Sequence, residues 1–190
     1  MKVEVLKKWI KIFSEKVFEN KEYLTYLDSL IGDSDHGNNL ARGLKIYNEE
    51  ILNNEYETPN DFFKDLAMLF LSKVGGASGA IYGTAFLKMS QISNQGSTLD
   101  ELLRTGLKGI QDRGKADVGE KTLVDIWDAV IKLLEENGTY TKEDLDAIID
   151  TTKQFKATKG RAAYVGERSM GQVDPGTYSS ALLFASYLEV

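Results

Sequence analysis

An acidic cluster stands near the start of the chain: Asp28, Asp33 and Asp35 lie within eight residues, and His36 follows directly. Three neighbouring carboxylates repel one another and resist ionising together unless a cation shares the site. Oxygen ligands with little nitrogen or sulfur suit hard cations such as Mg²⁺ or Ca²⁺. Because Mg²⁺ takes few carboxylates and completes its shell with substrate phosphates, the cluster favours a metal-bound phosphate ligand.

Besides a metal site for a phosphate ligand, this cluster has two other possible explanations, an EF-hand and a helix-capping turn. In an EF-hand starting at Asp33, Gly37 and Leu44 would stand where oxygen ligands are required, so that interpretation fails. A solvated turn that caps a helix starting near Asn38 is the second, since Asp and Asn are preferred capping residues. On spacing alone, the metal site and the capping turn are equally favoured.

A second loop, residues 75–79, reads Gly-Gly-Ala-Ser-Gly and leads into a helix expected to begin near Ala80. Small residues at a helix N-terminus leave backbone N–H groups free to hold phosphate. The loop is not a Walker A motif, because no Lys-Ser/Thr pair follows, and no strand precedes it as a Rossmann turn would require. Close helix packing through small residues is the structural alternative.

Glycine is concentrated in four segments that separate helical stretches. Glycine lets the backbone approach a ligand closely or adopt positive φ, and four ordinary turns are the alternative explanation. The segments are IGDSDHGNN (31–39), VGGASGAIYG (74–83), RGKADVGEKT (113–122) and ATKGRAAYVGERSMGQVDPGT (157–177).

Between these loops, apolar residues recur every three or four positions, which predicts amphipathic helices. No alternating strand pattern appears, so the fold class is all-α, a single domain over residues 1–190 with about eight or nine helices. Stripes run through Val3, Leu6, Ile10, Phe13 and Val17; Leu40, Leu44, Tyr47 and Ile51; Tyr82, Phe86, Met89 and Ile92; Leu145, Ile148, Ile149 and Phe155; and Tyr178, Ala181, Leu182, Ala185 and Leu188.

Helix ends are marked by capping signals. Thr58-Pro59 fits a cap and first turn, and Thr98 with Glu101 fits a capping box. Asn137-Gly138 predicts a helix end, and Thr141 opens the next helix.

Composition limits the classes of function. The chain has 190 residues, 42% of them hydrophobic and 27% charged, and a formal net charge of −6. That charge argues against nucleic acid as a partner, because little would neutralise its phosphates. Cysteine is absent, and no apolar run is long enough to cross a membrane. We therefore expect a cytoplasmic protein with neither a nucleic-acid nor a membrane partner.

The motifs GDSDHGNN, GGASGAIYG, GEKT and GERSMGQVDPG, in this order and spacing, resemble the L-subunit family of dihydroxyacetone kinases. The similarity runs from about residue 20 to the C-terminus and is strongest to stand-alone L subunits of phosphotransferase-system-dependent enzymes. It implies a closed barrel of about eight antiparallel helices with a nucleotide site at one end. The family usually has Asp and Met where Glu120 and Leu123 stand, and Ala at Thr177; these are mild changes.

The resemblance also implies a ligand set. Three aspartates would coordinate two Mg²⁺ ions that grip the diphosphate of ADP, while glycine-rich segments contact phosphate, ribose and adenine. Carried over to this chain, the metal ligands are Asp28, Asp33 and Asp35, and the nucleotide contacts are His36, Gly37, Asn38, Asn39, Ala77, Ser78, Gly114, Leu123, Arg161, Asp174, Pro175 and Gly176.

The family's mechanism implies two partner subunits. ADP stays bound and cycles to ATP: a phosphohistidine donor, the M subunit, phosphorylates it, and the phosphoryl group passes to dihydroxyacetone on the K subunit. A relay through His36 is less favoured than a contact of His36 with phosphate or an aspartate. Two alternatives remain open: an ATP-exchanging kinase for another small substrate, and a regulatory module that reports phosphorylation state to a transcription regulator.

Overall fold

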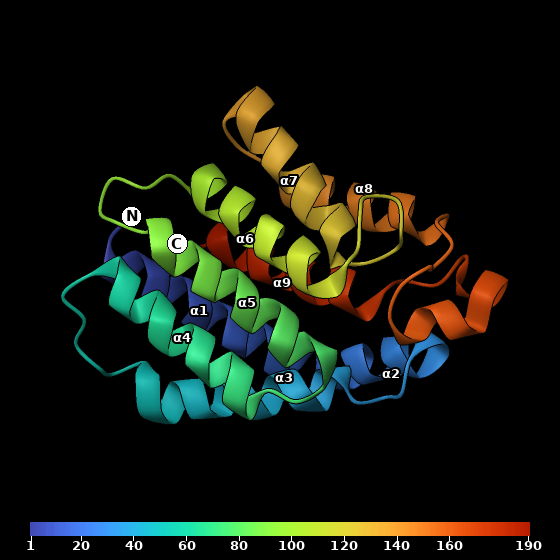
Figure 1. Cartoon of the computed structure of the whole chain (residues 1–190), viewed down its shortest axis with the longest axis horizontal. Helices are drawn as coiled ribbons and strands as arrows, with labels where there is room; N and C mark the ends of the chain where they lie inside the picture. Colours follow the sequence, from blue (N-terminus) through green and yellow to red (C-terminus); the bar gives the residue numbers. More distant parts are fainter.

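A computed structural model describes residues 1–190, and all of its regular structure is helical (Figure 1). Nine α-helices are joined by short connections, with one π-helical and one 3₁₀ segment. Their bounds are α1 Val3–Glu19, α2 Lys21–Ile31, α3 His36–Ile46, η1 Tyr47–Ile51, α4 Pro59–Lys73, α5 Gly76–Ile92, α6 Leu99–Gly114, α7 Leu123–Asn137, α8 Lys142–Lys153, η2 Arg161–Ser169 and α9 Pro175–Tyr187. The all-α prediction is confirmed.

The helices pack into a ring that closes on itself. Contacts run from α4 through α5, α6, α7, α9, α1 and α3 back to α4, while α2 and α8 pack on α9. Both termini lie at one end of this bundle, and α2, η2 and the loop between α6 and α7 gather at the other (Figure 1). One continuous core of 41 buried residues fills the ring.

Local sequence signals explain most helix ends. Thr58 caps α4 by accepting a hydrogen bond from Asp61 N, with Pro59 in the first turn. A capping box starts α6 at Thr98, as predicted, and Thr141 starts α8, as predicted, also with a capping box. Gly138 ends α7 with φ of 73°, a left-handed conformation that glycine adopts without steric cost.

Three predicted boundaries shift in the structure. Helix α3 begins at His36 rather than near Asn38, and α5 begins at Gly76 rather than near Ala80. The other shift is at Phe155, which lies beyond the end of α8. Small and polar residues carry no apolar period, so the apolar pattern does not reveal the first turns of α3 and α5.

The last helix, α9, is buried on nearly every side. Ser179, Ser180, Leu183 and Phe184 have no exposed surface, whereas Leu182 of the predicted stripe is only half-buried. The stripe prediction was too narrow because α9 lies among α1, α2, α7 and α8 rather than at the surface. A helix surrounded in this way needs no polar face.

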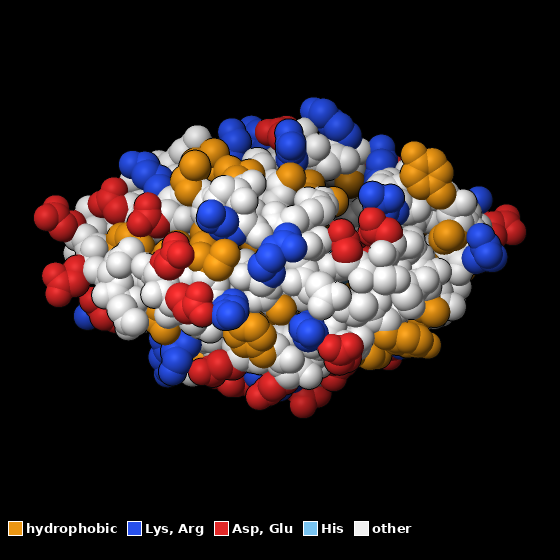
Figure 2. All heavy atoms as spheres, turned by 90° about the horizontal axis from the view of Figure 1, so that it is seen from below, with side chains coloured by type: hydrophobic (Ala, Val, Ile, Leu, Met, Phe, Trp, Pro, Cys, Tyr) orange, Lys and Arg blue, Asp and Glu red, His pale blue; other side chains and the backbone are white.

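The outer surface carries charges of both signs. Acidic and basic side chains are interspersed over the face seen in Figure 2, without a broad basic area. No helix combines the length and the apolar character needed to cross a membrane.

Candidate functional site

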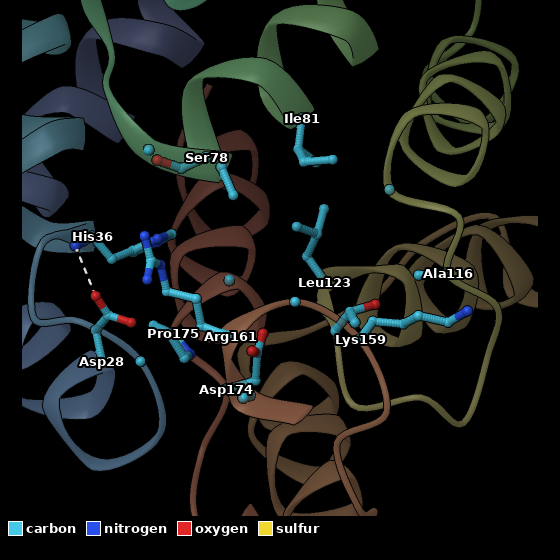
Figure 3. A pocket seen from close by; sticks show the side chains of 18 of the residues that line it. Asp28, His36, Ser78, Ile81, Ala116, Leu123, Lys159, Arg161, Asp174 and Pro175 are labelled. Carbon is cyan, nitrogen blue, oxygen red and sulfur yellow. Dashed lines mark hydrogen bonds between the residues drawn. The ribbon is translucent and has the colours of Figure 1, made fainter. Parts of the chain in front are cut away.

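Four helix N-termini open onto one cavity of about 660 Å³ at the end of the bundle away from the chain termini (Figures 1 and 3). Small-molecule sites in proteins usually measure about 300–1,000 Å³. The first turns of α3, α5, α7 and α9 line it, together with the C-terminal ends of α2 and α6. Helix N-termini carry a partial positive charge, so this end of the bundle favours an anion.

The three aspartates meet at one end of the cavity. Asp28 on α2 is buried, Asp35 half-buried and Asp33 exposed, and a carboxylate oxygen of each lies within 4.8 Å of the others. Asp28 Oδ2 accepts hydrogen bonds from the backbone N–H groups of Asp35 (2.8 Å) and His36 (3.1 Å). One fixed carboxylate and two accessible ones form an all-oxygen donor set that fits Mg²⁺.

The capping interpretation of this turn is partly correct, although a different residue does the capping. Asp35 occupies the N-cap position of α3, but its side chain makes no capping hydrogen bond. Asp28, from the preceding helix, satisfies the first N–H groups instead. The carboxylates of Asp33 and Asp35 therefore take no part in capping α3.

Two glycines give the carboxylates their room. A Cβ on Gly32 would lie 1.9 Å from Asp28 Oδ1, and one on Gly76 would lie 3.3 Å from both carboxylate oxygens of Asp35. Gly76 also has φ of +65°, a conformation that other residues rarely adopt. Glycine is therefore required on both sides of the acidic cluster.

The start of α5 faces this cluster without a side-chain cap. Its N-cap residue is Gly75, so the first-turn N–H groups donate to no capping side chain. Ala77 and Ser78 line the cavity at this turn, and the Ser78 hydroxyl donates back to Gly75 O (3.2 Å). The predicted phosphate loop is thus the first turn of a helix that starts beside Asp35 of the acidic cluster.

Apolar walls enclose the opposite end of the cavity. Ile81 and Leu123 face each other there with Ala116 beyond them (Figure 3), and Ile110 and Gly114 are also lining residues. This surface suits a flat apolar ring. Ile81 and Ile110 were not predicted, although each lies close to a glycine-rich segment on a helical stripe.

A buried lysine holds the turn beneath these walls. Lys121 Nζ donates to Thr152 O (3.0 Å) and Lys153 O (3.1 Å) at the end of α8, and its φ is +58°. Burial lowers the pKa of Lys121, against the opposing effect of Asp174 and Asp125. Sequence reasoning missed this residue, although it stands inside the GEKT motif.

Asp174 caps the helix that forms the floor of the site. It accepts hydrogen bonds from Thr177 N (2.7 Å) and Thr177 Oγ1 (3.1 Å) at the start of α9. Burial raises the pKa of Asp174 to about 6, although these bonds and Lys121 act in the other direction. Pro175 and Gly176 then continue the cavity lining.

A strap, residues 158–162, runs along the cavity from its apolar end to its acidic end. At the apolar end, Thr158 Oγ1 donates to Glu120 Oε1 (2.9 Å), and Lys159 Nζ lies 3.6 Å from the same oxygen. At the acidic end, Arg161 Nε is 2.8 Å from Asp33 Oδ2. Figure 3 shows Arg161 reaching across the middle of the cavity toward His36 and Asp28.

The single histidine lies between the acidic cluster and the core. His36 Nε2 is 2.9 Å from Ser179 Oγ on α9. Burial lowers the pKa of His36 to about 4, outweighing the opposite influence of Asp28 and Asp35. The imidazole is therefore neutral at pH 7.

Most of the predicted ligand residues surround the cavity. Twelve of the fifteen line it: Asp28, Asp33, Asp35, His36, Ala77, Ser78, Gly114, Leu123, Arg161, Asp174, Pro175 and Gly176. Their binding roles stay predictions.

Three predicted residues lie outside the lining. Gly37 packs against α2, where a Cβ would come within 2.3 Å of Lys21 O. The Asn39 side chain accepts a hydrogen bond from Arg42 Nη2 (3.0 Å), and Asn38 is exposed. These residues follow His36 around the first turn of α3, so they point to other sides of the helix.

Comparisons with known proteins agree with this geometry. Residues 30–189 match the family model described as the DAK2 domain. The chain is 48% identical to the "PTS-dependent dihydroxyacetone kinase, ADP-binding subunit DhaL" of Lactococcus lactis, over 96% of this chain and 94% of that protein. It is 46% identical to the ADP-binding subunit DhaL of the "PEP-dependent dihydroxyacetone kinase 1" of Listeria innocua, over 96% and 93%.

A solved structure has the same fold. The dihydroxyacetone kinase from C. freundii in complex with AMP-PNP and Mg²⁺ superposes with a TM-score of 0.78 at 21% identity. The alignment covers all of this chain but only 34% of that one, so the chain corresponds to about a third of that kinase.

Proposed function

This chain belongs to the DAK2-domain family, and from that premise we propose that it is the ADP-binding subunit of a dihydroxyacetone kinase. The relatives of similar length carry that name, and they align with nearly the whole chain. The proposed role is to hold ADP with Mg²⁺ and to present its terminal phosphate for phosphoryl transfer.

One observation carries the proposal: the cavity has two chemically different ends. Carboxylates and the uncapped N-terminus of α5 meet at one end, and aliphatic side chains enclose the other. A nucleoside diphosphate has the matching polarity, with an anionic tail and a flat base. In this orientation Leu123 and Ile81 would contact adenine, and Ala77 and Ser78 would contact the phosphates.

The acidic end supports a binuclear magnesium site. Asp28, Asp33 and Asp35 would hold two Mg²⁺ ions, which would neutralise the diphosphate and stabilise charge on the transferring phosphoryl group. Asp28 keeps its orientation through two backbone N–H groups. Asp33 would exchange its pairing with Arg161 for a metal, which would release the guanidinium toward the phosphates.

The chain's own residues would bind and orient rather than act as acid or base. Phosphoryl transfer depends chiefly on in-line positioning and charge stabilisation. We propose that a phosphohistidine donor, the M subunit, phosphorylates ADP in place, and that dihydroxyacetone on a K subunit receives the phosphoryl group. A general base for the acceptor hydroxyl would then belong to the K subunit.

Nucleotide analysis of the purified protein tests the binding role. The protein is prepared without added nucleotide and denatured, and the released compound is identified by chromatography and mass. We expect about one ADP per chain, lost on chelation of magnesium. An empty protein that binds ATP weakly and reversibly would favour an ATP-exchanging kinase, and binding of neither nucleotide would contradict the proposal.

Reconstitution tests the transfer role. The chain is combined with K and M subunits, the general phosphotransferase proteins and phosphoenolpyruvate, and dihydroxyacetone phosphate is measured. Asp35→Ala should abolish both ADP retention and product formation, because it removes an accessible member of the acidic cluster. Product formation at the wild-type rate by that variant would contradict the metal assignment.

A further inference from the structure

The side chain of Lys121 is committed to the end of a neighbouring helix. Only 1% of the residue is exposed, and its Nζ donates to the last two carbonyl groups of α8, Thr152 O (3.0 Å) and Lys153 O (3.1 Å). Carbonyl groups at a helix C-terminus have no partner within the helix, and the helix dipole there favours a cation. The lysine of a Walker A motif reaches phosphate, whereas this ammonium group is held by α8.

The backbone at Lys121 is fixed as firmly as its side chain. Its φ of +58° and the φ of +91° at Gly119 make a turn that residues with a Cβ rarely adopt. The Asp125 carboxylate holds this turn by accepting hydrogen bonds from Gly119 N and from Thr122 N (2.8 Å). Leu123 follows as the first residue of α7 and lines the apolar end of the cavity (Figure 3). The turn therefore sets where Leu123 lies.

The residues on either side of Lys121 bind other parts of the cavity wall. Glu120 Oε1 accepts a hydrogen bond from Thr158 Oγ1 of the strap (2.9 Å). Thr122 O accepts one from Thr177 Oγ1 in the first turn of α9 (3.2 Å). Consecutive residues thus connect the turn to the strap, to α8 and to α9, and Lys121 makes the connection to α8.

One of the carbonyl groups bound by Lys121 also anchors the chain beyond the strap. Lys153 O accepts a hydrogen bond from Gly171 N (2.7 Å), which lies where the chain returns from η2 toward α9. The turn is tied to the start of this segment at Thr158 and, through Lys121 and Lys153 O, to its end. Lys121 therefore connects the Leu123 wall to the segment that covers the cavity.

We propose that Lys121 is a positioning residue for the base of the nucleotide: by binding the C-terminal carbonyl groups of α8, it fixes Leu123 as a wall of the apolar end. It acts through Leu123 and makes no contact with phosphate. The effect on ADP rests on the proposed function, whereas the position of Leu123 can be measured without any nucleotide.

Methyl nuclear magnetic resonance of the nucleotide-free protein measures that position. With leucine methyl groups labelled with ¹³C, the Leu123 signals are those that disappear in Leu123→Met. Lys121→Met removes the ammonium group but keeps an unbranched side chain of similar length. We expect the Leu123 signals to shift or broaden in this variant, while those of Leu6, buried on α1, stay unchanged. Unchanged Leu123 signals would overturn the proposal.

A double-mutant cycle tests whether Lys121 acts through Leu123. In calorimetry with ADP at saturating Mg²⁺, Lys121→Met should weaken binding about tenfold, as the loss of a hydrogen bond from a charged donor can. In a Leu123→Ala background, the same substitution should change affinity by less than about twofold, because the wall that it positions is already gone. Losses that simply add would show that Lys121 acts elsewhere, for example on phosphate, and would refute the proposal.

Lys132→Met is the matched control, since Lys132 lies on the surface of the same helix α7 and pairs with Asp128. It should keep the wild-type Leu123 signals and ADP affinity. If Lys121→Met folds poorly, Lys121→Gln retains one donor group and should give intermediate effects; wild-type signals and affinity in that variant would equally refute the proposal. Displaced Leu123 signals in a protein whose wild type binds no ADP would leave the positioning of Leu123 standing while the proposed function fails.

Discussion

Replacing Gly32 with alanine tests how closely the acidic cluster is fitted to the backbone. The added Cβ would lie 1.9 Å from Asp28 Oδ1 and 2.9 Å from Asp28 Cγ. Carbon and oxygen atoms that are not bonded approach no closer than about 3 Å, so the Asp28 carboxylate must move by about 1 Å or more. Gly32 has a negative φ, so the contact with Asp28 is the principal effect of the substitution.

The size of the effect follows from what Asp28 holds. Its Oδ2 accepts hydrogen bonds from Asp35 N and His36 N. A hydrogen bond to a charged group contributes about 1.5–3 kcal/mol, so losing one corresponds to a change of about 10- to 100-fold in an equilibrium constant. Binding of Mg²⁺ and ADP must restore the carboxylate against that cost, and we expect affinity for ADP to fall by this factor.

Isothermal titration calorimetry with ADP at saturating Mg²⁺ measures this change. Gly96→Ala is the matched control, because Gly96 is exposed, far from the cavity, and a Cβ there would only touch Asn94 Oδ1 at 3.3 Å. The control should bind ADP as the wild type does. Affinity within threefold of wild type in Gly32→Ala would refute the idea that the position of Asp28 depends on this glycine.

Three further predictions address the base-binding end, the strap and the floor of the site. Leu123→Ala should weaken ADP binding about tenfold by removing ~1.5 kcal/mol of apolar contact, whereas Leu123→Met should stay within about threefold of the wild-type affinity. If calorimetry gave these two variants the same affinity for ADP, adenine would have to bind elsewhere. Thr158→Val removes the hydrogen bond to Glu120 and should speed release of a fluorescent ADP analogue about two- to tenfold in a stopped-flow chase; an unchanged rate would show that the strap does not limit release. Asp174 has a pKa raised to about 6, from about 4 when unfolded, so its ionisation costs stability as the pH rises through this range. Relative to Asp174→Asn, the wild type should therefore lose roughly 2 kcal/mol of unfolding free energy between pH 4 and pH 7, and a constant difference in denaturant titrations would contradict the raised pKa.

Much of the fold was predictable because helix signals are local. The apolar stripe from Leu6 to Val17 and the caps at Thr58, Thr98 and Thr141 depend on residues within one or two turns. The packing of α9 was not predictable in this way. Its surroundings come from helices far away in the sequence, and its buried serines look like surface residues until their partners are known.

The site was predictable where one motif places a residue directly in the cavity. Asp28, Asp33 and Asp35 converge because a short turn joins α2 to α3. Lys121 could not be recognised from spacing, because its partners are carbonyl groups more than thirty positions along the chain. The network of His36 with Ser179 was hidden for the same reason, since 143 positions separate the two residues.

The burial of α9 has a consequence for the order in which the protein is made. This helix supplies the Asp174-Pro175-Gly176 floor of the cavity and the serines behind His36, and it packs against α1, from the opposite end of the sequence. A ribosome must synthesise residues 175–187 before this space can close, even though every carboxylate of the acidic cluster has emerged long before. Nascent chains therefore carry the acidic cluster without the walls that would retain a nucleotide, and capture of ADP can only follow the late docking of α9.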